Sequence, residues 1–232
     1  MIKFMKLELQ RVNLRPYYIS SIISCFVLLA FTYFVAYVAQ VEQETEFMTY
    51  PNIFRFTNAV SIIIFGIFSA TMYTRLIIGE YSGKRLALLF SYPVSRKKIF
   101  LAKVLIVFTF IFISMLLCTT VPIIIFTVTE SIDPIVSDAL TSNLLIEVFK
   151  MTAVSLVAVS AIGLIATRIG FIKKSVPITL ISAFVLSGLY GNIAIGISRN
   201  FAVAPLLIGV SLVAVLEVTV TLSNKINQME VE

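Results

Sequence analysis

The chain has 232 residues, of which 59% are hydrophobic and 13% are charged, and its formal net charge is +6. With a mean hydropathy of +1.02, this composition excludes a water-soluble globular domain, because no soluble core of this size needs so much apolar surface. The chain contains no histidine, which excludes imidazole general bases, Ser-His nucleophile pairs and histidine-ligated metal sites.

Residues 1–16 are predicted to form a helix that lies in the membrane interface. Ile2, Met5 and Leu9 share one helical face, and lysines occupy the adjoining one. Basic side chains in this position reach anionic headgroups while the apolar face enters the acyl boundary. Pro16 then ends this helix or kinks it into the membrane.

Six stretches almost free of charge follow, each about as long as a membrane span. A helix rises roughly 1.5 Å per residue and the hydrocarbon core is about 30 Å thick, so about 20 apolar residues cross once. The sequence therefore predicts an all-α integral membrane protein with six transmembrane helices, and a single membrane domain over 1–232. The stretches are 16–41, 56–74, 104–129, 151–167, 175–198 and 200–216, the last continuing past Glu217.

The fifth stretch contains several residues that disfavour a regular helix. Pro177 is expected to break or kink its first turns. Gly188, Gly191 and Asn192 predict a helix that ends early and re-enters before the sixth stretch. The two cysteines lie inside the first and third stretches, where we expect free thiols that act as small apolar side chains.

The positions of the basic residues predict the orientation in the membrane. With the N-terminus placed inside, 15 of the 18 lysines and arginines are cytoplasmic, and only Arg55, Lys150 and Arg199 lie outside. Cytoplasmic loops retain Lys and Arg, so both termini are predicted to be cytoplasmic. The cytoplasmic position of the basic residues thereby accounts for the net positive charge, and no nucleic acid partner is expected.

The longest inner joint, 79–103, reads as a helix, a stop and a second helix. Ser82 is placed to cap the short first helix, which Tyr92 and Pro93 end. Ser95 is placed to cap the next one, which becomes the third span. An apolar ridge runs along the short helix at helical spacing, and it consists of Leu86, Leu89 and Phe90.

Cations in the first turns of both helices oppose the helix dipoles. They include Lys84, Arg85 and Arg96. We expect an anionic partner outside the chain to compensate them, either lipid headgroups or an acidic groove on a protein.

No nucleotide site is predicted in the chain. The nearest approach to a phosphate-binding loop, 79–85, is one residue short between its glycines, and Arg85 stands where the Mg²⁺-binding Ser or Thr belongs.

Glu217 is the deepest charge in the predicted spans, and charges at membrane depth are functional candidates. We expect it to accept a hydrogen bond from a neighbouring helix or to pair with Arg75 or Arg168, as a structural contact rather than as a proton carrier. Glu147 and Lys150 are predicted to form a local ion pair. So few intramembrane charges argue against an ion-coupled carrier.

The inner joint resembles the permease subunits of type-2 ABC transporters, the ABC-2 export class. The resemblance covers the six-span topology and a motif of an acid, a glycine, a short apolar helix, a Pro-Val-Ser-Arg turn and a lysine entering the next span. One position departs from the usual pattern, because Lys84 stands where Thr is usual. The matching residues are Glu80, Ser82, Gly83, Leu86, Leu89, Pro93, Val94, Ser95, Arg96, Ile99 and Lys103.

The resemblance implies that this joint is a coupling segment that docks on a separate ATPase subunit. It implies two ATPase copies, and a second permease that is either the same chain or a paralogue. ATP and Mg²⁺ would then be bound by the ATPase, and this chain would be no enzyme and hold no cofactor. The residues implied in coupling are Glu80, Ser82, Gly83, Lys84, Arg85, Leu86, Pro93, Ser95 and Arg96.

The resemblance further implies export across the plasma membrane. Small permeases of this kind are similar to exporters of antimicrobial or amphipathic peptides and to lantibiotic immunity systems. The spans offer apolar and small hydroxyl residues, which fit a hydrophobic or amphipathic cargo, and we expect a peptide. Lipid-linked cargo and a hydrophobic drug stay open, as do two other classes of function, an ion-coupled secondary carrier and a non-transporting membrane scaffold.

Overall fold

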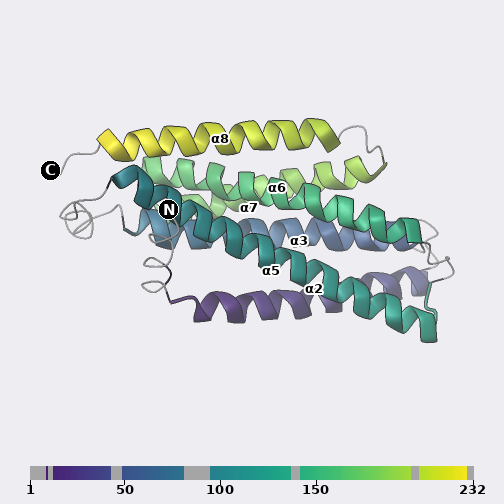
Figure 1. Ribbon diagram of the computed structural model, residues 1–232. Helices are drawn as coiled ribbons and strands as arrows, with labels where there is room; N and C mark the ends of the chain where they lie inside the picture. Colours follow the sequence, from purple (N-terminus) through teal and green to yellow (C-terminus); the bar gives the residue numbers. More distant parts are fainter. Residues whose placement is uncertain are drawn as a thin grey trace.

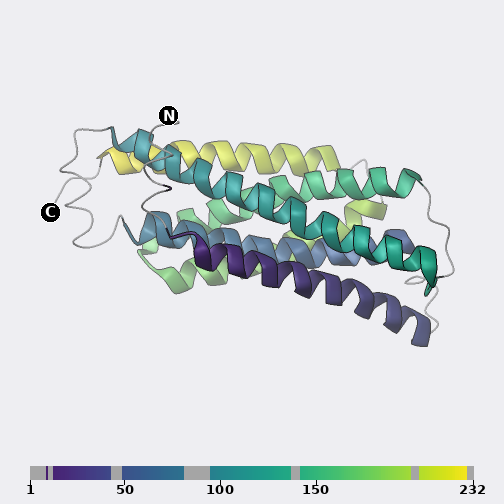
Figure 2. The ribbon, with the colours of Figure 1, turned by 60° about the horizontal axis from the view of Figure 1, so that its bottom comes forward.

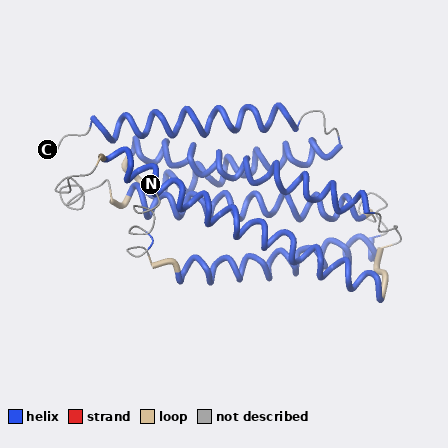
Figure 3. Tube along the Cα trace, in the orientation of Figure 1, coloured by secondary structure: helices blue, strands red, loops and turns tan. Residues whose placement is uncertain are grey.

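The computed structural model describes residue 9 and residues 13–42, 49–80, 95–136, 142–199 and 204–228. Within these ranges the chain is helical, and short turns lie at the two ends of the bundle (Figures 1 and 3). The helices are α2 (Arg15–Glu42), α3 (Tyr50–Tyr73) continued by a π-helix η1 (Thr74–Ile78), α5 (Arg96–Ile132), α6 (Ser142–Lys173), α7 (Val176–Arg199) and α8 (Ala204–Gln228).

In the described residues, six helices are long and apolar enough to cross a membrane, which confirms the predicted all-α fold with six spans. The helices alternate in direction along one axis (Figures 1 and 2). As a result, the starts of α2, α5 and α7 lie at the same end of the bundle as the ends of η1, α6 and α8. We call this the basic end, because it carries ten of the 13 lysines and arginines in the described residues.

The predicted interfacial helix, 1–16, lies almost entirely outside the described residues. Its last part is described: α2 begins at Arg15, and Pro16 falls in its first turn. Proline is tolerated there because the first-turn N–H groups have no intrahelical partner. The Asn13 side-chain oxygen accepts a hydrogen bond from the Arg15 N–H at 3.1 Å, where the helix starts.

α3 forms the centre of the bundle. It packs on α6, α7, α5 and α2, and 67% of its most apolar stretch is buried, against 22% in α2. α2 and α8 lie at opposite edges (Figures 1 and 2). A displacement of α3 therefore affects the four helices that pack on it.

Small residues allow the close packing of α3, α6 and α7. The Cα of Gly163 in α6 lies against the Ser69 side chain of α3, and the Cα of Gly66 in α3 lies against Ser187 of α7. In lipid, helices associate through such close backbone approach, since there is no hydrophobic driving force between them. A side chain at Gly163 would overlap Ser69 and make a tight contact with the Tyr73 ring.

The prediction that α7 breaks at its start and ends early is wrong. α7 is continuous from Val176 to Arg199. Pro177 lies in the first turn, where it removes no intrahelical bond. At the other end, the Asn192 amide donates to the Gly188 carbonyl at 2.8 Å within the helix. A continuous helix satisfies the backbone groups between its first and last turns, as a lipid environment requires.

The turn between α6 and α7 has the geometry of a helix C-cap. Lys174 takes a left-handed conformation with φ of 48°. The Ser175 N–H donates to the Gly170 carbonyl at 3.1 Å, and the Lys174 N–H donates to the Phe171 carbonyl at 3.4 Å. This is the bonding of a Schellman motif, in which glycine is the usual left-handed residue.

α5 has 37 residues, so it extends over about 55 Å and is longer than the membrane core is thick. Ser95 occupies the position before its first turn, as predicted, but its side chain makes no capping hydrogen bond. The Ser95 carbonyl instead accepts from the Lys98 N–H at 2.9 Å. The predicted side-chain cap is therefore wrong, and only the position of the helix start is right.

Candidate functional site

The residues predicted to couple the chain to an ATPase divide into two groups. Ser82, Gly83, Lys84, Arg85, Leu86 and Pro93 lie outside the described residues, so their roles stay predictions. The other three are described and flank the segment 81–94: Glu80 lies just before it, and Ser95 and Arg96 lie just after it. The structure therefore defines how this segment is attached to the bundle.

The attachment on the α3 side is a π-helix. In η1, the Gly79 N–H donates to the Thr74 carbonyl at 2.9 Å, five residues back. A π-turn inserts one extra residue, which rotates the residues after it by about 100° relative to an α-helix. Single π-turns occur frequently at functional sites. Here the π-turn determines the direction in which Glu80 lies, just after the end of η1.

Glu80 forms a buried ion pair with Lys103 of α5. Residue Glu80 is 8% exposed and Lys103 is 0% exposed. The Lys103 ammonium donates to Glu80 Oε2, and this contact compensates the two charges for the loss of water. Removing one partner of such a pair costs roughly 3–5 kcal/mol, because the remaining charge stays buried. The pair thus joins α3 firmly to α5.

Lys103 is the residue of this site whose contact the sequence did not reveal. It appears in the motif as the lysine that enters the third span, without an assigned partner. The signal that could have found it was its position among apolar residues of α5, since a lysine among buried neighbours such as Phe100 and Val107 needs a buried carboxylate. The motif supplies that carboxylate as Glu80.

Further polar contacts tie the basic end together. The Lys97 ammonium donates to the Asn224 side-chain oxygen of α8 at 3.0 Å. The Arg75 guanidinium of η1 lies 5.9 Å from the centre of the Tyr17 ring of α2, and the Lys225 ammonium lies 5.9 Å from the centre of the Phe171 ring. Cations over aromatic faces at such distances attract them. Both edge helices are therefore fastened at this end.

Glu217 pairs with Arg168, one of the two partners predicted for it. The Arg168 Nη1 to Glu217 Oε1 distance is 2.6 Å, and the two side chains are 34% and 59% exposed at the bundle surface. The other predicted partner, Arg75, contacts Tyr17. The pair neutralises two charges at membrane depth, where a lone charge is costly.

At the opposite end, Glu130 in the last turn of α5 is buried. Its carboxylate accepts a hydrogen bond from the Tyr50 hydroxyl at 3.0 Å, and from the backbone N–H groups of Ile135 and Val136, each at 3.1 Å. Because Tyr50 begins α3 and Glu130 belongs to α5, their hydrogen bond ties these two helices together at the end of the bundle away from Glu80.

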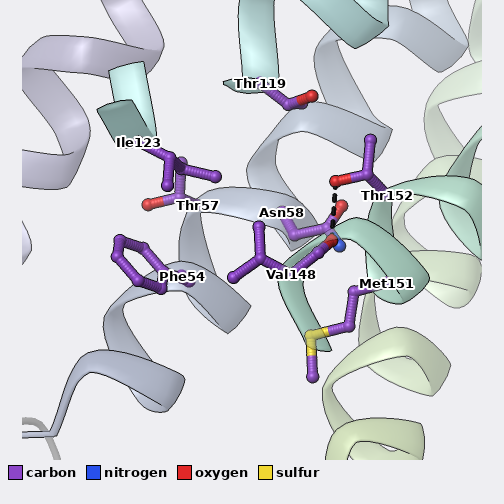
Figure 4. Close-up of a pocket in the computed structure, with 8 residues that line it drawn as sticks. All are labelled: Phe54, Thr57, Asn58, Thr119, Ile123, Val148, Met151 and Thr152. Carbon is purple, nitrogen blue, oxygen red and sulfur yellow. Dashed lines mark hydrogen bonds between the residues drawn. The ribbon is translucent and has the colours of Figure 1, made fainter. Parts of the chain in front are cut away.

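Between the ends, a small cavity lies among α3, α5 and α6 (Figure 4). It has about 10 Å³, room for about one water molecule. Polar side chains of all three helices line it, from Asn58, Thr119 and Thr152. The Thr152 hydroxyl donates to the Val148 carbonyl at 2.9 Å, so its oxygen lone pairs remain to accept a hydrogen bond.

An apolar groove of about 190 Å³ opens beside this cavity, between α5 and α6. Phe108, Phe112 and Phe149 line it and are 43%, 42% and 62% exposed. Thr152 lines both the groove and the cavity. An apolar surface and a polar one therefore meet at one residue inside the membrane-spanning part of the bundle.

Across the described residues, no group of three or more His, Cys, Asp or Glu side chains is arranged to hold a metal ion. Cys25 and Cys118 are both free thiols. The described chain offers instead ion pairs that position helices relative to one another, a buried one between Glu80 and Lys103 and an exposed one between Arg168 and Glu217.

These features define a multi-pass membrane protein. The segment 81–94, which follows its second span, contains basic residues and is flanked by Glu80 on one side and by Ser95 and Arg96 on the other. The chain matches the model of the ABC-2 family transporter proteins over residues 4–189 and belongs to this family. It is 25% identical over 202 residues to the uncharacterized protein YcbO of Bacillus subtilis strain 168, a match that covers 87% of this chain and 89% of that protein. No solved structure matches the chain.

Family membership identifies the chain as a membrane-spanning permease subunit of an ABC transporter. Membership of this family implies an ABC ATPase as partner in general.

Proposed function

We propose that this permease exports a hydrophobic or amphipathic peptide, driven by ATP that a separate subunit hydrolyses. The ATPase docks on the segment 81–94, through Ser82, Gly83, Lys84, Arg85, Leu86 and Pro93 together with Ser95 and Arg96, and Glu80 takes part in coupling by joining the segment to the bundle. The observation that carries this proposal is the ion pair between Glu80 and Lys103, which anchors both ends of the segment at the base of the most buried helix.

The charge distribution supports cytoplasmic docking. Ten of the 13 described lysines and arginines lie at the basic end, and basic residues are retained on the cytoplasmic side. Both termini and the segment 81–94 then lie in the cytoplasm, where ATP is present, and the chain spans the plasma membrane. Two permeases, two copies of this chain or one copy and a paralogue, pair with two ATPases.

The membrane-spanning part supports an amphipathic cargo. The groove lined by Phe108, Phe112 and Phe149 suits apolar side chains, and the adjacent hydroxyl-lined cavity suits a polar group. A lipid-linked molecule or a hydrophobic drug has similar chemistry, so the transport assay decides among these cargoes.

The proposal is tested by purifying the chain from membranes with its ATPase and reconstituting the complex in lipid vesicles. We expect a fluorescently labelled amphipathic peptide to stimulate ATP hydrolysis and to accumulate on one side only when ATP is present. Full transport by this polypeptide without any ATPase would refute the proposal. An unchanged peptide distribution with the ATPase bound would favour a non-transporting scaffold.

Charge reversal in the docking segment gives a sharper prediction. Arg85→Glu and Arg96→Glu are expected to abolish the coupled ATP hydrolysis while membrane insertion persists, because the cations face an acidic groove on the ATPase. Hydrolysis by the reconstituted complex and the amount of inserted protein are measured together. Lys150→Glu, at the other end of the bundle, is the control and should hydrolyse ATP like the wild type. Undiminished transport by the two arginine variants would contradict the assignment.

A further inference from the structure

Lys103 is an unusual residue for its place in the chain. It lies in the second turn of α5, close to the basic end, where a lysine can extend its side chain to water. Instead the side chain is fully buried, with an exposed fraction of 0%, and its ammonium donates to Glu80. The exposed Lys98, five residues earlier on the same helix, shows the ordinary arrangement.

The ion pair closes a loop in the chain. Glu80 and Lys103 are 23 positions apart, and the segment 81–94 lies between them. Because the two charges contact each other, the exit from α3 and the entry to α5 are held at a fixed separation. A charged contact within the bundle thus holds together the two described parts of the chain that flank the segment.

This charged contact leads directly into the core. Ile77 and Ile78, just before Glu80, are buried at 0% and 3% exposure, and η1 packs on α5, α6 and α7. α3 itself packs on four other helices. A displacement of the segment 81–94 therefore acts on α3 and α5 together, and α3 passes it to the rest of the bundle.

We propose that Lys103 is a positioning residue for energy coupling. Its ion pair with Glu80 makes α3 and α5 move as one unit when the ATPase displaces the segment 81–94, and without the pair the segment moves while the two helices separate. This inference rests on the proposed function, since it assumes an ATPase on that segment.

The first experiment separates positioning from folding. Lys103→Met leaves Glu80 buried without its cation and is expected to lower stability, whereas replacing a whole buried ion pair by apolar residues is often neutral or stabilising. Glu80→Leu/Lys103→Met should therefore retain the melting temperature and the bound ATPase of the wild-type complex. Its ATP hydrolysis should nevertheless fall by about fivefold or more. Lys103→Arg keeps the pair and should restore hydrolysis, and Lys98→Met should behave as wild type.

The second experiment measures the movement itself. Spin labels are placed at Thr71→Cys in α3 and Lys98→Cys in α5, both exposed, in a background with Cys25→Ala and Cys118→Ala. In the complex with Glu80 and Lys103 intact, the distance between labels should be the same without nucleotide and with ATP trapped by vanadate. In Glu80→Leu/Lys103→Met it should change by about 1–2 Å or more on ATP trapping.

Each outcome decides between the two proposals. Wild-type hydrolysis and a constant label distance in Glu80→Leu/Lys103→Met would overturn the inference about Lys103 and leave the proposed function standing. A nucleotide-dependent distance in the intact pair would also overturn it. A wild-type chain that retains no ATPase at all would overturn the proposed function, and the inference with it.

Discussion

Lys174 adopts a backbone conformation that usually belongs to glycine. Its φ of 48° lies in the left-handed region, which costs a residue with a Cβ roughly 1–2 kcal/mol. The conformation is held by the two hydrogen bonds that close the turn between α6 and α7. The backbone conformation of Lys174 therefore lowers the stability of the fold, and it allows a tight turn between α6 and α7.

Lys174→Gly is expected to stabilise the protein by about 1 kcal/mol, because glycine accepts the left-handed conformation without strain. Thermal unfolding of the purified protein in detergent measures the change. Lys173→Gly is the matched control: it removes the same charge one residue earlier, in the last turn of α6, and should destabilise by up to about 1 kcal/mol. A lower melting temperature for Lys174→Gly would show that its side chain, rather than its backbone, matters.

Glu217 is expected to be a structural partner of Arg168, since the two atoms of their ion pair are 2.6 Å apart. Glu217→Gln should lower the melting temperature and leave ATP-driven transport in place, because a neutral amide still fills the site. Glu217→Gln/Arg168→Gln, which removes both charges, should recover part of the lost stability. Loss of transport at an unchanged melting temperature would instead indicate a proton carrier.

Individual contacts were predictable from the sequence only where few partners existed. The sequence offered Glu217 two arginines or a hydrogen bond from a neighbouring helix, and the structure shows the pair with Arg168. It contained Glu80 and Lys103 in one motif, yet their contact depends on the turn of η1 and on how α3 packs against α5. Neither follows from hydropathy, because a π-turn has no clear sequence signal.

At the level of elements, the packing of α3 on α6 depends on Gly163. Gly163→Ala places a methyl group into the Ser69 side chain and in tight contact with the Tyr73 ring and is expected to destabilise the protein by about 1–3 kcal/mol. Gly188→Ala, in α7, meets no atom within 4 Å and should be neutral or slightly stabilising, since alanine is the better helix former. Unfolding in detergent compares the two.

Placing the glycine in α3 instead of α6 should restore the packing of the two helices. Ser69→Gly removes the side chain that the new methyl group meets, so Ser69→Gly/Gly163→Ala should be more stable than Gly163→Ala alone. Equal melting temperatures for these two variants would mean that the contact between α3 and α6 is not the limiting one.

The number of helices was predictable, but hydropathy did not give their ends. The charge-free stretch 151–167 corresponds to α6, which starts at Ser142, whereas the start of α5 at Arg96 was predicted from Ser95 and not from hydropathy. Hydropathy marks the part of a helix that lies in lipid, whereas the helix continues through charged residues such as Glu147. The helix-breaking residues of α7 led to the wrong prediction of a broken helix for a related reason. A segment in lipid has no alternative to the helix for its backbone hydrogen bonds.

At the scale of the whole molecule, the two ends of the bundle have different characters. The basic end holds the Glu80 to Lys103 pair and most described cations, whereas the opposite end is closed by Glu130 through the Tyr50 hydroxyl and two backbone N–H groups. α3 is fixed to α5 at both ends by a buried carboxylate. This arrangement is consistent with a unit that transmits displacement along its length.

The orientation of these ends gives the prediction on which the others depend. With Cys25→Ala and Cys118→Ala as background, single cysteines are introduced at Lys173 in the basic end and at Ile132, which is 80% exposed, in the opposite end. A membrane-impermeant maleimide added to intact cells should label Ile132→Cys, and should label Lys173→Cys only after permeabilisation, because cations remain in the cytoplasm. The reverse pattern would place the segment 81–94 outside the cell, where no ATPase has ATP. Both the docking assignment and the coupling role of Lys103 would then be wrong, even with every helix in its place.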